Sequence, residues 1–266
     1  MGISKNGTNT NVHQVIIDTE KCIGCGLCQK DCVGFDIDMV DGKAKANGRS
    51  CIMCGHCEAI CPQGAIKITG FEDEITEYAE QVRLDPKQLM DAIKTRRTIR
   101  QFVDKEVPKD VLDMILEAGR MAPTGANSQG TRYVVLKDKK DECEAVAVGI
   151  FSKLVNTGKK FIPQLASMEI GTSFFFKKAP LVIVIFGKDA VSASLAAENM
   201  TFMAEANGLG VLFSGFFTTV VNMSSKVRRI MGVGKKPKAV TTLVIGYPAV
   251  KYHRTPHRKP LNCQYR

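Results

Sequence analysis

Long apolar stretches are missing from this chain of 266 residues. Its longest unbroken apolar run covers only Leu181 to Phe186, whereas a helix that crosses a bilayer needs roughly 20 such residues. The first residues also lack the basic-then-apolar order of a secretory leader. We therefore expect no membrane partner and a cytoplasmic location. The 44% of hydrophobic and 24% of charged residues exclude a wholly disordered chain and predict a packed core.

Two common nucleotide-binding motifs are missing as well. The segment 208–213 lacks the third glycine of a dinucleotide fingerprint, and 232–236 lacks the spacing and the hydroxyl residue of an ATPase-type phosphate loop. The chain has only four histidines, and no Ser/His/Asp set is recognisable. We therefore predict no catalytic side-chain nucleophile and expect a bound cofactor to supply the chemistry.

Cysteine, in contrast, is abundant and concentrated. Eight of the ten cysteines lie between Cys22 and Cys61, in two runs with the spacing C-x2-C-x2-C-x3-C. Each cysteine of the first run has a counterpart 29 residues later, so the segment is an internal repeat. The spacing is that of two-cluster ferredoxins, in which the fourth cysteine of each run ligates the other cluster. We assign Cys22, Cys25, Cys28 and Cys61 to one [4Fe-4S] cluster, and Cys32, Cys51, Cys54 and Cys57 to a second.

Structural zinc and disulfides are the two alternative interpretations of these cysteines. Structural zinc usually takes two C-x2-C pairs instead of two four-cysteine runs, and disulfides are reduced in a cytosol. Residues 15–70 resemble a bacterial two-[4Fe-4S] ferredoxin domain, although Val33 stands where that pattern has a proline. His56, inside the second run, is expected to be an exposed loop residue. Such clusters carry single electrons, so the remaining chain should supply a partner site or a second cofactor.

Composition changes near residue 70. Residues 1–70 contain seven basic and seven acidic side chains, so the net charge of +10 belongs to the remainder. We predict a ferredoxin domain over 1–70, a linker helix over 71–89 and a second domain over 90–266. The excess positive charge would attract anionic cofactors or an acidic electron-carrier protein such as ferredoxin or flavodoxin, or serve solubility alone. The basic stretches lack interleaved aromatic residues, so no nucleic-acid partner is expected.

Hydrophobic periodicity predicts an α+β fold with four or five strands. A helix should start at Asp85-Pro86, and Gly119 and Gly208 should end two others. The stretch 150–176 has little periodicity, and we expect it to cover a substrate pocket. Strands are expected over 14–18, 65–69, 133–136, 179–186, 211–217 and 240–245, and helices over 108–119, 192–207 and 224–231.

Four basic or hydroxyl side chains gather at Arg96, Arg97, Thr98 and Arg100. Guanidinium groups bind phosphate through paired hydrogen bonds, so this segment is a candidate site for a phosphate monoester. A solvated helix end is the alternative on charge alone.

A family resemblance supports the phosphate site. The order Arg-Arg-Thr-x-Arg-x-Phe from Arg96 resembles the opening motif of the flavin-dependent nitroreductase family. Residues 122–129 resemble that family's A-P-S-x-x-N-x-Q loop, with Thr124 in place of serine. Further likenesses follow in order at Gly208-Leu-Gly210 with Ser214-Gly215, and at 246–248 with the basic residues behind it. The resemblance covers residues 90–260.

The resemblance implies a nitroreductase-like domain with a mixed central sheet flanked by helices, bound FMN and a homodimer with the flavin between subunits. It places the phosphate and ribityl chain at the segment 96–100 and the flavin edge at Ser214 and Gly215. Asn127 and Gln129 would bind from the neighbouring subunit, although Asn127 also suits a turn. The implied FMN contacts are Arg96, Arg97, Thr98, Arg100, Pro123, Thr124, Asn127, Gln129, Ser214, Gly215 and either Arg254 or Arg258.

The two resemblances together predict an oxidoreductase of anaerobic metabolism. Electrons would pass from the two clusters to FMN and then to a small organic acceptor such as a nitroaromatic or a quinone. Two alternatives stay open. One is an electron-relay or flavin-storage module without its own substrate. The other is a dedicated metabolic reductase for dehalogenation or enone reduction.

Overall fold

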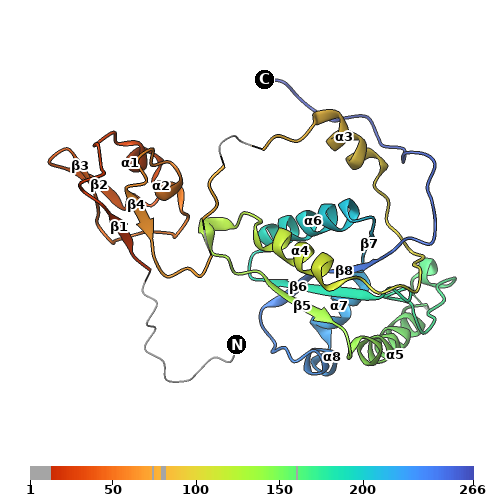
Figure 1. The fold of residues 1–266 in the computed structure, drawn as a ribbon. Coiled ribbons are helices and arrows are strands. Elements are labelled where there is room, and N and C mark those ends of the chain that lie inside the picture. The colour runs from red at the N-terminus through yellow and green to blue at the C-terminus, as the bar shows by residue number, and fades with distance from the viewer. Residues whose placement is uncertain (1–12, 74, 79–81, 160) are drawn as a thin grey trace. The chain divides into compact units, whose positions relative to one another are not determined.

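The computed structural model describes residues 13–73, 75–78, 82–159 and 161–266 (Figure 1). The chain divides into two compact units, which are described separately. The first contains the described residues up to Val82 together with Ala126–Ser128, and the second contains Arg83–Gly125 and Gln129–Arg266. We retain 1–70, 71–89 and 90–266 as the proposed domain limits.

The first unit is built from short strands and helices around the cysteines. Strand β1 pairs antiparallel with β4, and β2 pairs antiparallel with β3. The duplicated sequence gives a duplicated register, because the pair Ile37–Ala46 recurs 29 residues away as Ile66–Ile17. The elements are β1 (Val15–Ile17), α1 (Leu27–Asp31), β2 (Ile37–Val40), β3 (Lys43–Ala46), α2 (His56–Ala59) and β4 (Ile66–Ile68).

Glycine begins both short helices of this unit. Gly26 precedes α1 with φ of 72°, and Gly55 precedes α2 with φ of 76°. A residue with a Cβ rarely adopts this left-handed conformation, so glycine allows each cysteine loop to turn sharply into its helix. The expected strands over 14–18 and 65–69 are observed as β1 and β4.

The predicted linker helix is not formed in the described part of 71–85. Apolar side chains of this stretch, such as Ile75, Tyr78 and Val82, are exposed, and helices of this length are marginal in water without a surface to pack on. The next helix, α3 (Pro86–Thr95), starts where expected, since the Asp85 carboxylate accepts the backbone N–H of Gln88 at 2.6 Å.

The second unit carries a four-stranded sheet in the order β5-β6-β8-β7, with antiparallel neighbours throughout. A parallel bridge from Thr98 to Val211 of β7 adds the mixed character at one edge. The remaining elements of the unit are α4 (Lys109–Arg120), β5 (Arg132–Leu136), α5 (Lys140–Gly158), β6 (Leu181–Gly187), α6 (Ala190–Ala206), β7 (Gly210–Phe213), α7 (Gly215–Met223), α8 (Ser225–Ile230) and β8 (Lys238–Gly246), with short 3-10 turns at Gly125–Asn127 and Pro163–Leu165.

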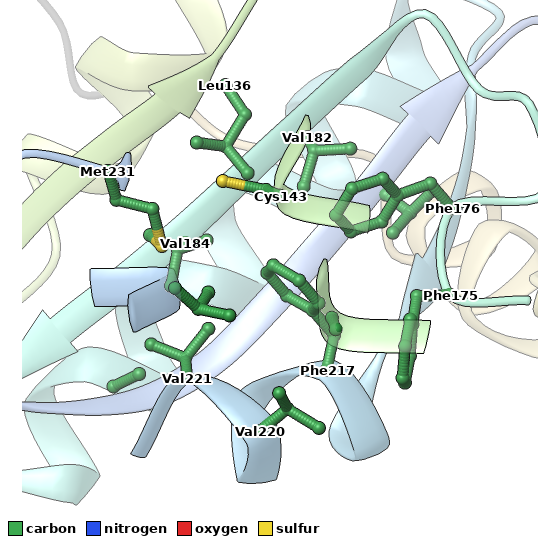
Figure 2. Packing of buried hydrophobic residues seen from close by; sticks show 14 of the residues in the cluster. Leu136, Cys143, Phe175, Phe176, Val182, Val184, Phe217, Val220, Val221 and Met231 are labelled. Atoms are coloured by element: carbon green, nitrogen blue, oxygen red, sulfur yellow. The ribbon is translucent and has the colours of Figure 1, made fainter. Parts of the chain in front are cut away.

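Helices cover both faces of this sheet (Figure 1). Strand β6 is buried along its whole length, which matches its unbroken apolar sequence. One core joins the sheet to α4 and α6, and the other joins it to α5, α7 and α8. Figure 2 shows the second core, where Phe176 lies beside Val182 and Cys143, and the rings of Phe175 and Phe176 both pack against Phe217. The predicted α+β class is therefore confirmed.

A buried carboxylate fixes the chain before β6. Glu144 of α5 accepts the backbone N–H groups of Phe175 at 3.0 Å and of Phe176 at 2.8 Å. Burial raises the pKa of Glu144, and the two N–H donors partly offset this rise. The carboxylate therefore replaces strand or helix partners for a segment that has no regular structure of its own.

Three expectations about this unit need correction. Gly119 lies inside α4, which ends at Arg120, instead of capping it. Glycine is needed there because an added Cβ would come within 2.8 Å of Met200 and would prevent the close approach of α4 and α6. The strand expected over 211–217 ends at Phe213, and α7 begins at Gly215 with a buried face. The supposed lid over 150–176 is helix α5 up to Gly158, and Phe175 and Phe176 belong to the core.

Among the described residues, no helix is long and apolar enough to cross a membrane.

Candidate cluster cavities and cationic groove

Two small cavities lie inside the first unit, and each is lined by four cysteines. The first contains Cys22, Cys25, Cys28 and Cys61, and the second contains Cys32, Cys51, Cys54 and Cys57. These are the two sets expected from the repeat, including the exchange of the fourth cysteine between the runs. In the described part of the chain, no three His, Cys, Asp or Glu side chains are placed to hold a single metal ion. The thiols surround a space, and this donor set fits a cluster held by four cysteines.

Backbone N–H groups point at the sulfurs. Asp36 donates to Cys32 Sγ at 3.3 Å and Ala65 donates to Cys61 Sγ at 3.3 Å, and these two bonds are equivalent under the repeat. Ala44 donates to Cys22 Sγ at 3.4 Å. Hydrogen bonds to ligand sulfurs help to set the reduction potential of a cluster.

Burial acts against ionisation of the inner thiols. It raises the pKa of Cys57 to about 11 and also raises that of Cys28. The backbone N–H of Ala44 lowers the pKa of Cys22. A coordinating metal displaces the thiol proton outright, so the buried pair is suited to bind metal and poorly suited to react as free thiols.

The two residues singled out beside the cysteines are exposed. Val33, which replaces the expected proline, is 68% exposed. His56 lies in the second loop with its Nδ1 3.0 Å from the Asp31 carboxylate, so it is engaged on the surface as expected for a loop residue.

The second unit contains an open groove of about 940 Å³, a volume typical of small-molecule sites. Among the residues lining it are Arg96, Arg97, Lys251 and Tyr252, with Glu205 of α6. Apolar side chains of α3, α4 and α6 form its walls. The groove therefore combines a cationic end with an apolar interior.

The segment 96–100 leaves α3 and runs along the edge of the sheet. The N–H of Ile99 bonds to the carbonyl of Val211 at 3.1 Å, and Thr98 forms the parallel bridge. Neighbouring side chains of an extended segment point to opposite sides. Consistent with this, Thr98 and Arg100 are not among the groove-lining residues. The structure therefore brings only part of the predicted phosphate set together.

Two of the charged side chains in the groove interact with neighbouring groups. The guanidinium of Arg97 stacks over the Tyr252 ring at 5.2 Å. Burial raises the pKa of Glu205 to about 7, while Arg96 opposes the rise. Within the described residues, no carboxylate lies within ion-pair distance of Arg96, Arg97 or Arg100, so their charges are available to an anion.

The predicted loop 122–129 is divided between the units. Pro123 and Thr124 belong to the second unit, where Thr124 Oγ1 accepts the N–H of Gln129 at 3.0 Å. Asn127 groups with the first unit, and its amide donates to the carbonyls of Ile52 at 3.1 Å and Met53 at 2.8 Å. Asn127 and Gln129 have positive φ, which only a well-held loop maintains.

The remaining predicted contacts lie elsewhere. Ser214 is buried at the start of α7, and its hydroxyl donates to the carbonyl of Phe175 at 3.2 Å. Gly215 follows with open space beside its Cα. Arg254 and Arg258 are exposed in the irregular C-terminal segment, and neither lines the groove.

Comparison with known proteins identifies both units. Residues 93–247 match the model of the nitroreductase family, and residues 14–62 match that of the 4Fe-4S dicluster domain. The chain belongs to the nitroreductase family. Both sequence resemblances are thereby confirmed, and the chain is an enzyme of the flavin-oxidoreductase type.

Relatives of this nitroreductase-family chain carry several names. It is 26% identical over 193 residues to an iodotyrosine deiodinase of Hydra vulgaris, covering 64% of this chain and 69% of the relative. It is 22% identical over 176 residues to a putative NADH dehydrogenase/NAD(P)H nitroreductase of Methanothermobacter thermautotrophicus, covering 63% and 81%. A nitroreductase with bound FMN from Bacteroides fragilis aligns with a TM-score of 0.51 and 20% identity, covering 67% of this chain and 99% of that one. The structural likeness confirms the fold.

Sequence inspection missed three side chains that line the groove. Glu205 is a charged residue in the last turn of a helix predicted from its apolar positions, and Lys251 and Tyr252 follow the Gly-Tyr-Pro motif. Tyr252 carried no signal by itself, because its stacking on Arg97 depends on the tertiary fold. Lys251 lies in a basic stretch, from which the sequence predicts only a general positive charge.

Proposed function

We propose that this chain is an FMN-dependent oxidoreductase in which two [4Fe-4S] clusters deliver electrons, through FMN, to a small organic acceptor. The observation that carries the proposal is the pair of four-thiol cavities on the same chain as a nitroreductase domain. Such clusters supply single electrons, and a flavin supplies pairwise reduction of an organic acceptor. The protein's part is to hold these groups and to exclude other reactions.

The cysteine cavities support the proposed cluster count. Each cavity has its own complete set of four thiols, and backbone N–H groups of Asp36, Ala44 and Ala65 stabilise the negative charge on the ligand sulfurs. We expect about eight irons per chain. The matching 4Fe-4S dicluster model supports the same number.

The cationic segment supports FMN binding. Arg96 and Arg97 present guanidinium groups without ion-pair partners among the described residues, and Lys251 adds a third positive charge at the groove. Because burial raises the pKa of Glu205 to about 7, its carboxylate competes less with a phosphate below neutral pH. The Bacteroides fragilis relative was crystallised with bound FMN. We keep Thr98 and Arg100 as phosphate contacts and Ser214 and Gly215 beside the flavin ring.

A homodimer with FMN at the subunit interface completes the proposal. Helix α3 buries none of its side chains, and Leu89, Met90 and Ile93 are exposed on it. An isolated helix of ten residues is marginally stable, so this one needs a covering surface. A second copy would provide it and would bring Asn127 and Gln129 to the neighbouring flavin. An acidic carrier such as ferredoxin or flavodoxin, a cytoplasmic location and anaerobic metabolism remain predictions, as does the lack of nucleic-acid and membrane partners.

The charge reversal Arg100→Glu tests the flavin assignment. Protein purified without oxygen should contain about eight irons and close to one FMN per chain. The variant should keep its iron and lose nearly all FMN, because a carboxylate repels the phosphate. The matched variant Lys94→Glu makes the same change on the exposed end of α3 and should retain FMN. Full FMN in Arg100→Glu would refute the assignment of Arg100 to the phosphate, and iron-free protein would refute the cluster proposal.

Turnover assays separate the remaining functions. Steady anaerobic reduction of nitroaromatics or quinones, with reduced ferredoxin or NAD(P)H as donor, supports the enzyme. Reoxidation only by a protein partner would favour the relay or flavin-storage module. Because one relative is named iodotyrosine deiodinase, halogenated phenols belong in the acceptor panel, and enones test the other metabolic alternative.

A further inference from the structure

The two cysteine cavities are related by the repeat, so any difference between them stands out. Cys22 and Cys51 occupy equivalent positions, 29 residues apart. Cys22 Sγ accepts the backbone N–H of Ala44 at 3.4 Å, and the backbone N–H of Gly24, the counterpart of Met53, also lowers its pKa. Cys51 Sγ accepts the backbone N–H of Met53 at 3.4 Å and, in addition, lies 3.2 Å from Nε2 of His13. Only the second cavity has a side-chain donor at this sulfur in the described part of the chain.

The repeat explains why the first cavity lacks such a donor. The counterpart of His13 is Gly42, which lies in the turn between β2 and β3 with φ of 75°. A tight hairpin turn requires glycine there, so that position carries no side chain. His13 instead lies where the chain enters β1, next to the bond from the Thr69 N–H to the Gln14 carbonyl. The pairing of β1 with β4 is therefore intact, and the His13 imidazole contacts Cys51 beside it.

The surroundings of His13 determine which nitrogen carries the proton. A metal-bound cysteine sulfur only accepts hydrogen bonds, so Nε2 must donate to Cys51. Nδ1 is buried and has no hydrogen-bond partner among the described residues. An Nδ1 atom without a proton at this buried position costs less free energy than an Nδ1–H group that has no acceptor. Phe71 packs edge-on against the ring at 6.2 Å between centroids, and Gly70 backs it closely enough that an added Cβ would meet His13 Cα at 3.2 Å. Phe71 therefore packs against the ring, and Gly70 packs against the His13 backbone.

Charges around the two cavities differ as well. Asp36 lines the second cavity, is 2% exposed, and accepts the N–H groups of Arg49 and Ser50. Its counterpart at the first cavity is the uncharged Ala65. Lys43 lies at the first cavity, where its ammonium group donates to the carbonyl of Cys22. A buried negative charge opposes the addition of an electron, and a positive charge favours it, so the second cavity is the less favourable place for an added electron.

We propose that His13 is a positioning residue that raises the reduction potential of the cluster at Cys32, Cys51, Cys54 and Cys57, through its Nε2–H···Sγ hydrogen bond to Cys51. This inference rests on the proposed presence of two clusters. The bond stabilises the extra negative charge of the reduced cluster and offsets the nearby Asp36. Without it the two centres would differ more in potential, and the second would accept electrons less readily.

The test is an anaerobic redox titration of the full chain, followed by electron paramagnetic resonance at one fixed pH. His13→Phe keeps a ring and removes the donor, and His13→Gln keeps an N–H donor. In His13→Phe we expect one of the two cluster potentials to fall by about 59 mV. This shift corresponds to a tenfold change in the equilibrium constant for one-electron reduction. The other potential should stay, and His13→Gln should restore much of the shift. His253→Phe removes an exposed imidazole of the second unit and should leave both potentials unchanged.

Iron content distinguishes a failed inference from a failed function. Fewer than about eight irons in the wild-type chain would refute the two-cluster proposal itself. With eight irons present, equal potentials in His13→Phe and wild type would overturn the role of His13. A second measurement does not depend on any variant at residue 13. After labelling with ¹⁵N-histidine, pulsed resonance of the reduced His56→Phe protein should show a ¹⁵N coupling, and its absence would contradict the hydrogen bond.

Discussion

The cysteine segment and the arginine segment behave differently when sequence is compared with structure. In the first, eight residues chosen by spacing line two cavities in the two expected sets. In the second, only Arg96 and Arg97 of the predicted set line the groove, and Thr98 and Arg100 do not. Both segments are short and rich in one chemistry, so composition does not explain the contrast.

Backbone conformation explains it. Each cysteine run turns through a left-handed glycine, Gly26 or Gly55, into a short helix, and residues three apart in such a turn face one side. The residues 97–100 instead lie along β7, where alternate side chains face opposite ways. A compact motif in a tight turn is therefore a local site. A compact motif on an extended edge segment directs its side chains to two sides, so the site that it forms depends on the elements packed against each side.

Replacing one cysteine is the strongest test of whether the cysteine segment forms its cluster sites locally. Cys57→Ser removes a buried ligand of the second cavity, and we expect the loss of about four of the eight irons. Iron and sulfide analysis after anaerobic purification measures the change. The control is Cys143→Ser, which alters another buried cysteine, in the core of the second unit, and should leave iron unchanged. If Cys57→Ser kept all its iron, the assignment of this cavity would be wrong.

Much of the fold follows from periodicity, and the misses have physical causes. The buried strand β6, the Asp85 cap of α3 and the Gly208 end of α6 all carry local signals. Helix α5 was missed because apolar residues occupy several sides of it, which hides the 3.6-residue period. The boundary between β7 and α7 was missed because five of the residues 211–217 are apolar and only Ser214 and Gly215 interrupt them. The periodicity of a short apolar run does not by itself distinguish a strand from a segment of a buried helix.

The site residues also fall into those that the sequence predicts and those that it does not. The cysteine sets were predictable because the repeat specifies both the ligands and their exchange between runs. Glu205 and Tyr252 were not, since each acquires its role from a neighbour far away in sequence, Arg96 for one and Arg97 for the other. His13 has no counterpart under the repeat other than Gly42, so only the folded chain shows its contact with Cys51.

The arginine segment should be sensitive to its neighbour β7. In Gly210→Ala the new Cβ would lie 2.2 Å from Cγ1 and 2.9 Å from Cβ of Ile99, which forces the segment away from the strand. We expect a loss of about 2 kcal/mol in the free energy of unfolding of the second unit, a typical cost of overpacking, together with weaker FMN retention. Urea unfolding followed by circular dichroism gives the first quantity. Gly149→Ala, where the Cβ meets open space in α5, should stabilise slightly instead. Equal effects of the two variants would show that the segment is not held by this contact.

The smallest expected effect concerns the desolvation of the groove. Burial raises the pKa of Glu205 from 4.5 to about 7, so its favourable contribution is present below about pH 4.5 and is lost as the pH rises through 7. Because the side chain is only partly buried, we expect a loss of about 1 kcal/mol, after allowance for solvent screening. Glu205→Gln removes the ionisation, so its unfolding free energy should fall less than that of the wild type between pH 5.5 and pH 8.5. Urea unfolding at the two pH values measures the difference, with the exposed Glu169→Gln as control. If all three proteins had the same pH dependence, the groove would be as hydrated as open surface, and the reduced competition of Glu205 with a phosphate would have no basis.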